Sequence, residues 1–176
     1  MPNPISREQL KSIKAIAMDV DGVLTDGGLW WGADGEEFKR FSFSDIMGLS
    51  LARRAGFVMT LISGENSPLV DRYAAKMHIQ DVTKGCRDKA TALRQFAERN
   101  SLELEHICFM GDDVNDLSAM EIAGFSAAPA NARPEVLAKV NFVAASNGGN
   151  GAVRELVDAL LAARDLDSQT LFLKRI

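Results

Sequence analysis

Short, almost continuously apolar runs alternate along the chain with longer segments of helical periodicity. Continuous apolar runs are typical of parallel strands that are covered on both faces. Alternation of such strands with helices predicts an α/β fold with a doubly wound parallel sheet. The predicted strands are 15–20, 57–63, 106–112, 125–130 and 141–145, and the predicted helices are 45–56, 66–77, 88–100, 116–124 and 151–165.

Two of the predicted helices carry clear signals at their ends. Gly56 suits the position just after the last turn of the first helix. Ser67 is the expected N-cap of the second helix, and Pro68 lies in its first turn. We find no internal repeat, low-complexity tract or linker, so the sequence predicts a single domain over residues 1–176.

The segment 27–43 interrupts the alternation. Its two aromatic-rich runs flank Asp34-Gly35, a dipeptide typical of hairpin turns. Trp30 and Trp31 are adjacent, so in a strand their side chains point to opposite faces. One hairpin cannot cover both faces. We therefore expect it either to pack on its own domain or to join the hairpins of other subunits in an oligomer.

The composition limits the partners and the location of the protein. Acidic residues outnumber basic ones and give a net charge of −4, which argues against nucleic-acid and anionic-membrane partners. Cys86 and Cys108 are compatible with the reduced thiols of a cytoplasm. No signal-peptide core or run of about 20 apolar residues is found. We expect a cytoplasmic protein.

Polar side chains cluster where the predicted strands end. Ligands of parallel α/β sheets bind outside the carboxyl ends of the strands, so these side chains should meet at one edge. Carboxylates so close together raise each other's pKa unless a cation, a shared proton or water compensates. Oxygen ligands favour Mg²⁺, and His78 and His106 are too isolated for a zinc site. The clustered residues are Asp19, Asp21, Ser63, Gly64, Lys89, Asp112 and Asp113.

These residue types suit phosphoryl transfer. The Asp19 carboxylate can attack phosphorus and form an aspartyl-phosphate. Asp21, two residues on, can protonate the leaving oxygen and later deprotonate a water. Ser63 and Lys89 can hold the phosphoryl oxygens and neutralise their charge.

Four motifs, in order, resemble those of the haloacid dehalogenase (HAD) phosphatases. They are "DVDGVLTDG" at 19–27, the strand-end Ser63, Lys89, and "GDDVND" at 111–116. The resemblance covers residues 15 to about 130 and implies that Asp19 is the nucleophile and Asp21 the acid/base.

The same resemblance implies the ligands of a Mg²⁺ ion. These are the Asp19 carboxylate, the backbone carbonyl of Asp21 and the carboxylate of Asp112. Asp113 and Asp116 would then lie behind the ligands or replace one of them.

A closer resemblance covers nearly the whole chain. An HAD domain with a hairpin in place of a cap, and with "GGNGAVREL" at 148–156, is similar to the 3-deoxy-D-manno-octulosonate (Kdo) 8-phosphate phosphatase family. Those enzymes are tetramers whose hairpins form a central barrel, so the resemblance implies a homotetramer. It also implies that the tail 166–176 covers a neighbour's site through the cations Lys174 and Arg175. The alternative is that Leu171 and Phe172 pack back on their own domain.

The resemblance implies a phosphorylated 2-keto-3-deoxy sugar acid as substrate, used in lipopolysaccharide or another cell-surface glycan. The chain departs from the usual family motifs at "SGE" (63–65, for TGR) and "SDIMG" (44–48, for RDG). Glu65 and Lys76 instead resemble a pair in phosphatases of nine-carbon nonulosonate 9-phosphates. An ordinary surface ion pair is the other interpretation. The predicted substrate contacts are Gly64, Glu65, Asn66 and Lys76.

Two other classes of protein share some of these features. A receiver-type signalling domain also has acids, Mg²⁺, a Ser or Thr and a Lys, but its acidic pair follows the first strand and its phospho-accepting Asp comes later. A dinucleotide-binding domain needs glycines, not acids, after the first strand. Lys39 and Arg40 are equally consistent with a solvated strand face and with a functional role, and "GGNG" at 148–151 is interpreted as a tight turn into a helix.

Overall fold

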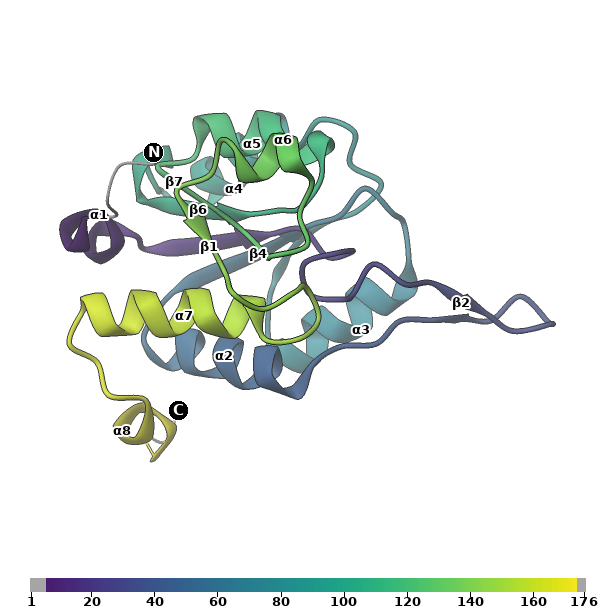
Figure 1. Ribbon diagram of the computed structural model, residues 1–176, viewed down its shortest axis with the longest axis horizontal. Helices are drawn as coiled ribbons and strands as arrows, with labels where there is room; N and C mark the ends of the chain where they lie inside the picture. The colour runs from purple at the N-terminus through teal and green to yellow at the C-terminus, as the bar shows by residue number, and fades with distance from the viewer. Residues whose placement is uncertain (1–5, 174–176) are drawn as a thin grey trace.

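Six parallel strands form the central sheet of the computed structural model, which describes residues 6–173. The strand order is β5-β4-β1-β6-β7-β8, and every neighbouring pair is parallel. Helices cover both faces of the sheet (Figure 1). The predicted doubly wound α/β fold is therefore confirmed. The strands are β1 (Ala15–Met18), β4 (Val58–Ile62), β5 (Asp81–Thr83), β6 (Ile107–Met110), β7 (Phe125–Ala128) and β8 (Phe142–Val143).

Two layers of helices enclose the sheet (Figure 1). One layer contains α2 (Phe43–Arg54), α3 (Pro68–Met77) and α7 (Ala152–Ala163), and the other contains α4 (Lys89–Arg99), α5 (Leu117–Ile122) and α6 (Pro134–Leu137). Short helices α1 (Arg7–Ser12) and α8 (Ser168–Leu173) lie near the two ends. In the described part of the chain, no helix is both long and apolar enough to cross a bilayer.

The central strand β1 contributes to both cores by simple alternation. Ile16 and Met18 belong to the core beneath α2, α3 and α7, whereas Ala15 and Ala17 belong to the core beneath α4, α5 and α6. All four side chains are completely buried. Small alanines on one face leave room for large side chains such as Phe96 from α4. This packing fixes the carboxyl end of β1, where the candidate site begins.

The predicted ends of α2 and α3 are confirmed. The Ser67 hydroxyl accepts a hydrogen bond from the Leu69 amide, and Pro68 is the first residue of α3. Helix α2 ends at Arg54, and Gly56 follows with a φ of +86°. A residue other than glycine would be strained in this left-handed conformation.

Strand β5 was not predicted, because its sequence "DVT" is short and lacks an apolar run. It is an edge strand whose three residues are only half-buried, so burial leaves little pattern in its sequence. The Thr83 carbonyl nevertheless accepts a hydrogen bond of 2.8 Å from the Ser63 amide. The short helices α1, α6 and α8 were also not predicted.

The predicted hairpin extends away from the sheet (Figure 1). Strand β2 (Trp30–Trp31) pairs antiparallel with β3 (Glu37–Phe38). Gly35 in the turn has a φ of +86°. Trp30, Trp31 and Phe38 are 68%, 74% and 53% exposed, so their apolar surface is not covered by the chain's own core. Within residues 6–173, no separate cap domain covers the edge of the sheet.

One apolar residue of the C-terminal tail packs on its own chain, whereas Phe172 and Leu173 are 51% and 71% exposed. Leu171 in α8 is 7% exposed and belongs to the core that includes α2. The Arg54 guanidinium lies 5.8 Å from the centre of the Phe172 ring. Lys174 and Arg175, the cations expected to reach a neighbour's site, lie outside the described residues.

We expect the hairpin to join copies of this chain into a tetramer, because exposed patches of this kind mark interaction surfaces. Replacing Trp30 and Trp31 together by Ser should convert the expected tetramer into smaller species that remain folded, although loss of subunit contacts lowers their melting temperature. Light scattering at micromolar concentration measures the mass, and Val143→Ser, at an exposed apolar position on the edge strand β8, serves as the control. A monomeric wild type would contradict the prediction.

Candidate active site

The carboxyl ends of β1, β4 and β6 surround a cavity of about 380 Å³. Each strand passes directly into a polar residue or a glycine, as the sequence predicted for this edge. Five of the lining residues are carboxylates. The cavity is lined by Asp19, Asp21, Gly64, Glu65, Asp112, Asp113, Val114 and Asn115.

Lys89 is completely buried beside this cavity and links two of the acidic segments. Its ammonium lies 2.8 Å from Asp19 Oδ1 and 2.6 Å from Asp116 Oδ1. Burial alone would lower the pKa of Lys89, but the charges of Asp19 and Asp116 outweigh this effect and raise it. Lys89 is therefore a permanent cation, held by the first turn of α4 at the end of β1.

Asp116 holds the loop after β6 in place. Its Oδ2 accepts hydrogen bonds from the amides of Asp112, at 2.9 Å, and Asp113, at 3.2 Å. Its Oδ1 contacts Lys89. Because both oxygens are engaged and the residue is completely buried, Asp116 supports the loop from behind the cavity.

Asp112 has an oxygen that lacks a partner. Its Oδ1 is buried and has no hydrogen-bond donor within the described structure. The carboxylate also packs against Gly22, where an added Cβ would lie 2.1 Å from Asp112 Oδ2. Burial, followed by the charges of Asp19, Asp116 and Asp113, raises the pKa of Asp112 to about 7. A buried carboxylate oxygen without a donor is a suitable ligand for a cation.

Asp19 has a similarly perturbed carboxyl group. It is 6% exposed, and its backbone amide donates to the Met110 carbonyl at 2.9 Å. Burial raises its pKa to about 6, against the opposing charge of Lys89. Perturbed carboxyl groups in a cavity are typical of a functional site.

These carboxylates fit a divalent cation. Oxygens of Asp19, Asp112 and Asp116 lie within 4.8 Å of one another. Asp116 is already occupied by three donors, so Asp19 and Asp112 remain as carboxylate ligands. An all-oxygen set of few carboxylates suits Mg²⁺.

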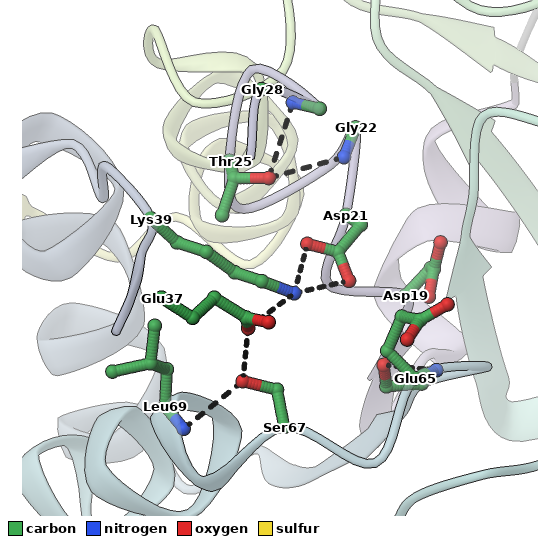
Figure 2. Close-up of polar contacts among 12 residues, drawn as sticks. Asp19, Asp21, Gly22, Thr25, Gly28, Glu37, Lys39, Glu65, Ser67 and Leu69 are labelled. Atoms are coloured by element: carbon green, nitrogen blue, oxygen red, sulfur yellow. Dashed lines mark hydrogen bonds and ion pairs between the residues drawn. The ribbon is translucent and has the colours of Figure 1, made fainter. Parts of the chain in front are cut away.

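The carboxylate of Asp21 has a different partner, which is Lys39. The Lys39 ammonium lies 2.7 Å and 2.8 Å from the two Asp21 oxygens (Figure 2). The Lys39 side chain is only 3% exposed, so of the two alternatives left open for it, the solvated strand face is excluded. Arg40 is half-exposed and pairs with Asp26 at 3.4 Å. No motif in the sequence marked Lys39 as part of the site.

The loop after β4 brings Ser63, Gly64 and Glu65 to the cavity. Ser63 is completely buried, and its Oγ accepts a hydrogen bond of 3.1 Å from the Glu65 amide. Because this oxygen acts as an acceptor, the hydroxyl hydrogen can be donated to a ligand. Gly64 and Glu65 line the cavity directly.

Asn66 and Lys76 do not line this cavity. Lys76 instead lines a second cavity of about 340 Å³, together with Lys39 and Tyr73. Throughout residues 6–173, Glu65 and Lys76 form no ion pair with each other. Of the alternatives left open for these two residues, an ion pair within one chain is therefore ruled out. Lys76 lies in the last turn of α3, outside the cavity that Glu65 lines. Val114 and Asn115 line the site without having been predicted, although both lie within the fourth motif.

The glycine turn at 148–151 supports the loop that carries Asp21, and Asp45 in turn supports the glycine turn. An added Cβ on Gly148 would lie 1.7 Å from the Gly22 carbonyl oxygen, so only glycine fits there. The Gly149 amide donates to Val23 at 2.9 Å. Asp45 is completely buried and accepts hydrogen bonds from the amides of Gly151 and Arg154 at the start of α7. The glycine turn therefore packs directly beneath the loop that carries Asp21.

Comparisons with known proteins agree with this geometry. A family model of haloacid dehalogenase-like hydrolases matches residues 44–156. The 3-deoxy-D-manno-octulosonate 8-phosphate phosphatase of Escherichia coli K12 is 34% identical over 92% of this chain and 87% of its own length.

Solved structures give the same result. The enzyme of that name from Moraxella catarrhalis, in complex with magnesium, phosphate and KDO, superposes with a TM-score of 0.91 at 35% identity, over 96% of this chain and 97% of that one. The cobalt-bound deoxy-D-mannose-octulosonate 8-phosphate phosphatase of Haemophilus influenzae gives 0.89 at 35% identity, over 94% and 99%.

We expect Mg²⁺ to stabilise the protein more at about pH 8 than at about pH 5. Without metal, the raised pKa values of Asp112 and Asp19 mean that the folded state binds more protons than the unfolded state between these pH values. Folding stability from these two groups therefore increases as the pH falls, and protons compete with the metal.

The measurement is the melting temperature with EDTA and with Mg²⁺ at both pH values. Asp112→Asn should reduce the Mg²⁺ effect and its pH dependence, whereas Glu98→Gln, at an exposed carboxylate on α4, should change neither. An equal Mg²⁺ effect at both pH values would contradict the prediction.

Proposed function

Because this chain belongs to the haloacid dehalogenase-like hydrolases, in the family that includes the 3-deoxy-D-manno-octulosonate 8-phosphate phosphatases, we propose that it is a Mg²⁺-dependent phosphatase of Kdo 8-phosphate. The observation that carries the proposal is the pair of carboxylates Asp19 and Asp112 at the edge of the sheet. Asp19 is buried and contacts Lys89, and Asp112 is half-buried with one oxygen that lacks a partner. The similarity to the Moraxella enzyme, which holds magnesium, phosphate and KDO, supports the same substrate class.

In the first step, the Asp19 carboxylate attacks the phosphorus of the substrate. The bond between phosphorus and the sugar oxygen breaks, and Asp21 gives a proton to that leaving oxygen. An aspartyl-phosphate on Asp19 and the free sugar acid result. Both carboxylates line the same cavity, as this step requires.

In the second step, a water molecule attacks the aspartyl-phosphate. Asp21, now ionised, takes a proton from that water and is ready for the next cycle. The bond between phosphorus and Asp19 breaks, inorganic phosphate leaves, and the Asp19 carboxylate is regenerated. The two steps together consume one water molecule for each phosphate ester.

Ser63 and Lys89 bind the phosphoryl group during both steps. The Ser63 hydroxyl has a hydrogen to donate, and the Lys89 ammonium already contacts Asp19 at 2.8 Å. Both groups are buried and held in place before the substrate arrives, which is the arrangement that stabilises growing negative charge most effectively.

Asp19 and Asp112, with the backbone carbonyl of Asp21 that the family pattern implies, would hold the Mg²⁺ ion. When bound, the ion supplies positive charge that lowers the repulsion between the carboxylates and an incoming phosphate. The unpartnered Oδ1 of Asp112 supports this assignment.

The eight-carbon sugar acid is favoured over the nine-carbon one. The relatives named for their substrate act on the eight-carbon ester. Glu65 and Lys76 resemble a pair in the nine-carbon phosphatases, but within one chain they line different cavities. This separation weakens the argument for a nine-carbon substrate. Glu65 itself lines the site, so it is the residue in position to affect the choice of sugar.

A receiver-type signalling role is the weaker alternative. Such a domain needs one phospho-accepting Asp and no second acid for turnover. Here Asp21 follows Asp19 at the same strand end and lines the same cavity, which favours an enzyme that releases phosphate.

Asp19→Asn should abolish phosphatase activity, by several orders of magnitude in kcat, while the melting temperature stays close to that of the wild type. The amide cannot act as the attacking carboxylate but has the same shape. Release of inorganic phosphate from Kdo 8-phosphate measures the effect. Glu98→Gln, at an exposed carboxylate on α4, is the control and should retain full activity; near-normal kcat in Asp19→Asn would refute the mechanism.

The substrate assignment is tested by comparing kcat/KM for Kdo 8-phosphate and for a nonulosonate 9-phosphate. We expect the wild type to prefer Kdo 8-phosphate by about tenfold or more, the factor that about 1.4 kcal/mol of differential binding provides. Glu65→Arg should change this ratio, and Glu98→Arg, on the exposed surface of α4, should not. A wild-type preference for the nine-carbon ester would overturn the assignment but leave the phosphatase chemistry intact.

A further inference from the structure

We propose that Lys39, which follows the returning strand of the aromatic hairpin, is a positioning residue for the acid/base Asp21. This inference rests on the proposed function, because it assigns Asp21 its role in phosphate release. Lys39 directly follows β3, and its ammonium contacts both oxygens of the Asp21 carboxylate, at 2.7 Å and 2.8 Å (Figure 2).

The burial of Lys39 indicates a specific function for its charge. Lysine side chains are seldom buried, because removing an ammonium from water costs free energy unless a partner compensates. The Lys39 side chain is 3% exposed, whereas the adjacent Arg40 side chain is 52% exposed. The chain therefore directs one of two neighbouring cations inward and leaves the other at the surface.

Lys39 is itself held from the side opposite Asp21. Glu37 Oε1 lies 3.9 Å from the Lys39 ammonium and accepts a hydrogen bond of 2.6 Å from the Ser67 hydroxyl (Figure 2). Ser67 is the N-cap of α3 and follows the loop that brings Ser63, Gly64 and Glu65 to the cavity. The line Asp21–Lys39–Glu37–Ser67 thus connects the loop after β1 with the loop after β4.

The two buried lysines divide the carboxylates between them. Lys89 contacts Asp19 and Asp116, and Lys39 contacts Asp21 and Glu37. In the described residues neither lysine forms an ion pair with the carboxylates of the other. Lys89 therefore contacts the nucleophile Asp19 and the loop after β6, whereas Lys39 contacts the acid/base Asp21.

The geometry defines what Lys39 does for Asp21. An aspartate side chain has two rotatable bonds and can turn away from the cavity, and Asp21 is 29% exposed. A contact from one ammonium to both oxygens fixes the plane and the direction of the carboxylate. A general acid or base must lie within hydrogen-bond reach of the transferred proton, so a fixed orientation increases the rate of proton transfer.

The experiment compares Lys39→Met, Lys39→Arg and Arg40→Met with the wild type in the release of phosphate from Kdo 8-phosphate. Lys39→Met keeps an apolar side chain of similar length and removes the charge. It should lower kcat by about tenfold or more, because a misoriented Asp21 loses part of the rate enhancement that a general acid/base supplies. KM should change by no more than about twofold. Lys39→Arg should recover part of the loss, and Arg40→Met should behave as the wild type.

A double-mutant cycle with Asp21→Asn separates positioning from a structural role. If Lys39 acts through Asp21, adding Lys39→Met to Asp21→Asn should cause no further loss of kcat. A structural role would instead lower kcat further in the double variant, together with the melting temperature or the assembled mass. Either that additive loss, or a Lys39→Met variant as active as Arg40→Met, would overturn the inference.

The same experiment separates this inference from the function on which it rests. A wild type that releases phosphate, with an inactive Asp19→Asn variant, supports the proposed function whatever Lys39→Met does. A wild type without turnover would overturn both. Melting curves and light scattering on every variant identify a loss of activity that comes from misfolding.

Discussion

The contact between the Lys89 ammonium and the carboxylates of Asp19 and Asp116 is the interaction on which the rest of the site depends. It joins the end of β1, the start of α4 and the loop after β6 in a buried environment. With Asp112, three carboxylates face this one ammonium, so the cluster has an excess of two negative charges. That excess equals the charge of one divalent cation. Burial, together with the charges of neighbouring carboxylates, raises the pKa values of Asp19 and Asp112.

The parallel sheet makes this cluster possible. Strands β1, β4 and β6 run in the same direction and are in register, so residues far apart in the sequence emerge at one edge. The loops that follow are packed too closely for ordinary side chains. Gly22 lies against Asp112, and Gly148 lies against Gly22. Close packing of loops that carry charge keeps water out and strengthens the ionic contacts.

The sequence was sufficient to predict what depends on strand ends. The sheet, the clustered carboxylates and Ser63 could be predicted because these polar residues follow apolar runs. Lys89, at the start of a helix, could be predicted from its place in the motif order of the family. The sequence was not sufficient where position depends on tertiary packing. Lys39 and Arg40 are adjacent cations in a polar segment, and only the fold decides which one turns inward. Lys76 was predicted to contact the substrate but lines the second cavity, because the direction of α3 determines which cavity it faces.

The register of the hairpin has a consequence for how this chain can vary. Trp30 pairs with Phe38, and Lys39 is the next residue. The exposed turn over residues 32–36 is the kind of site where proteins usually tolerate insertions. Side chains alternate between faces along a strand, so a slip of one residue between β2 and β3 would turn the Lys39 side chain away from Asp21. An insertion that shifted this register would therefore act as an active-site mutation, although it lies in a solvent-exposed loop.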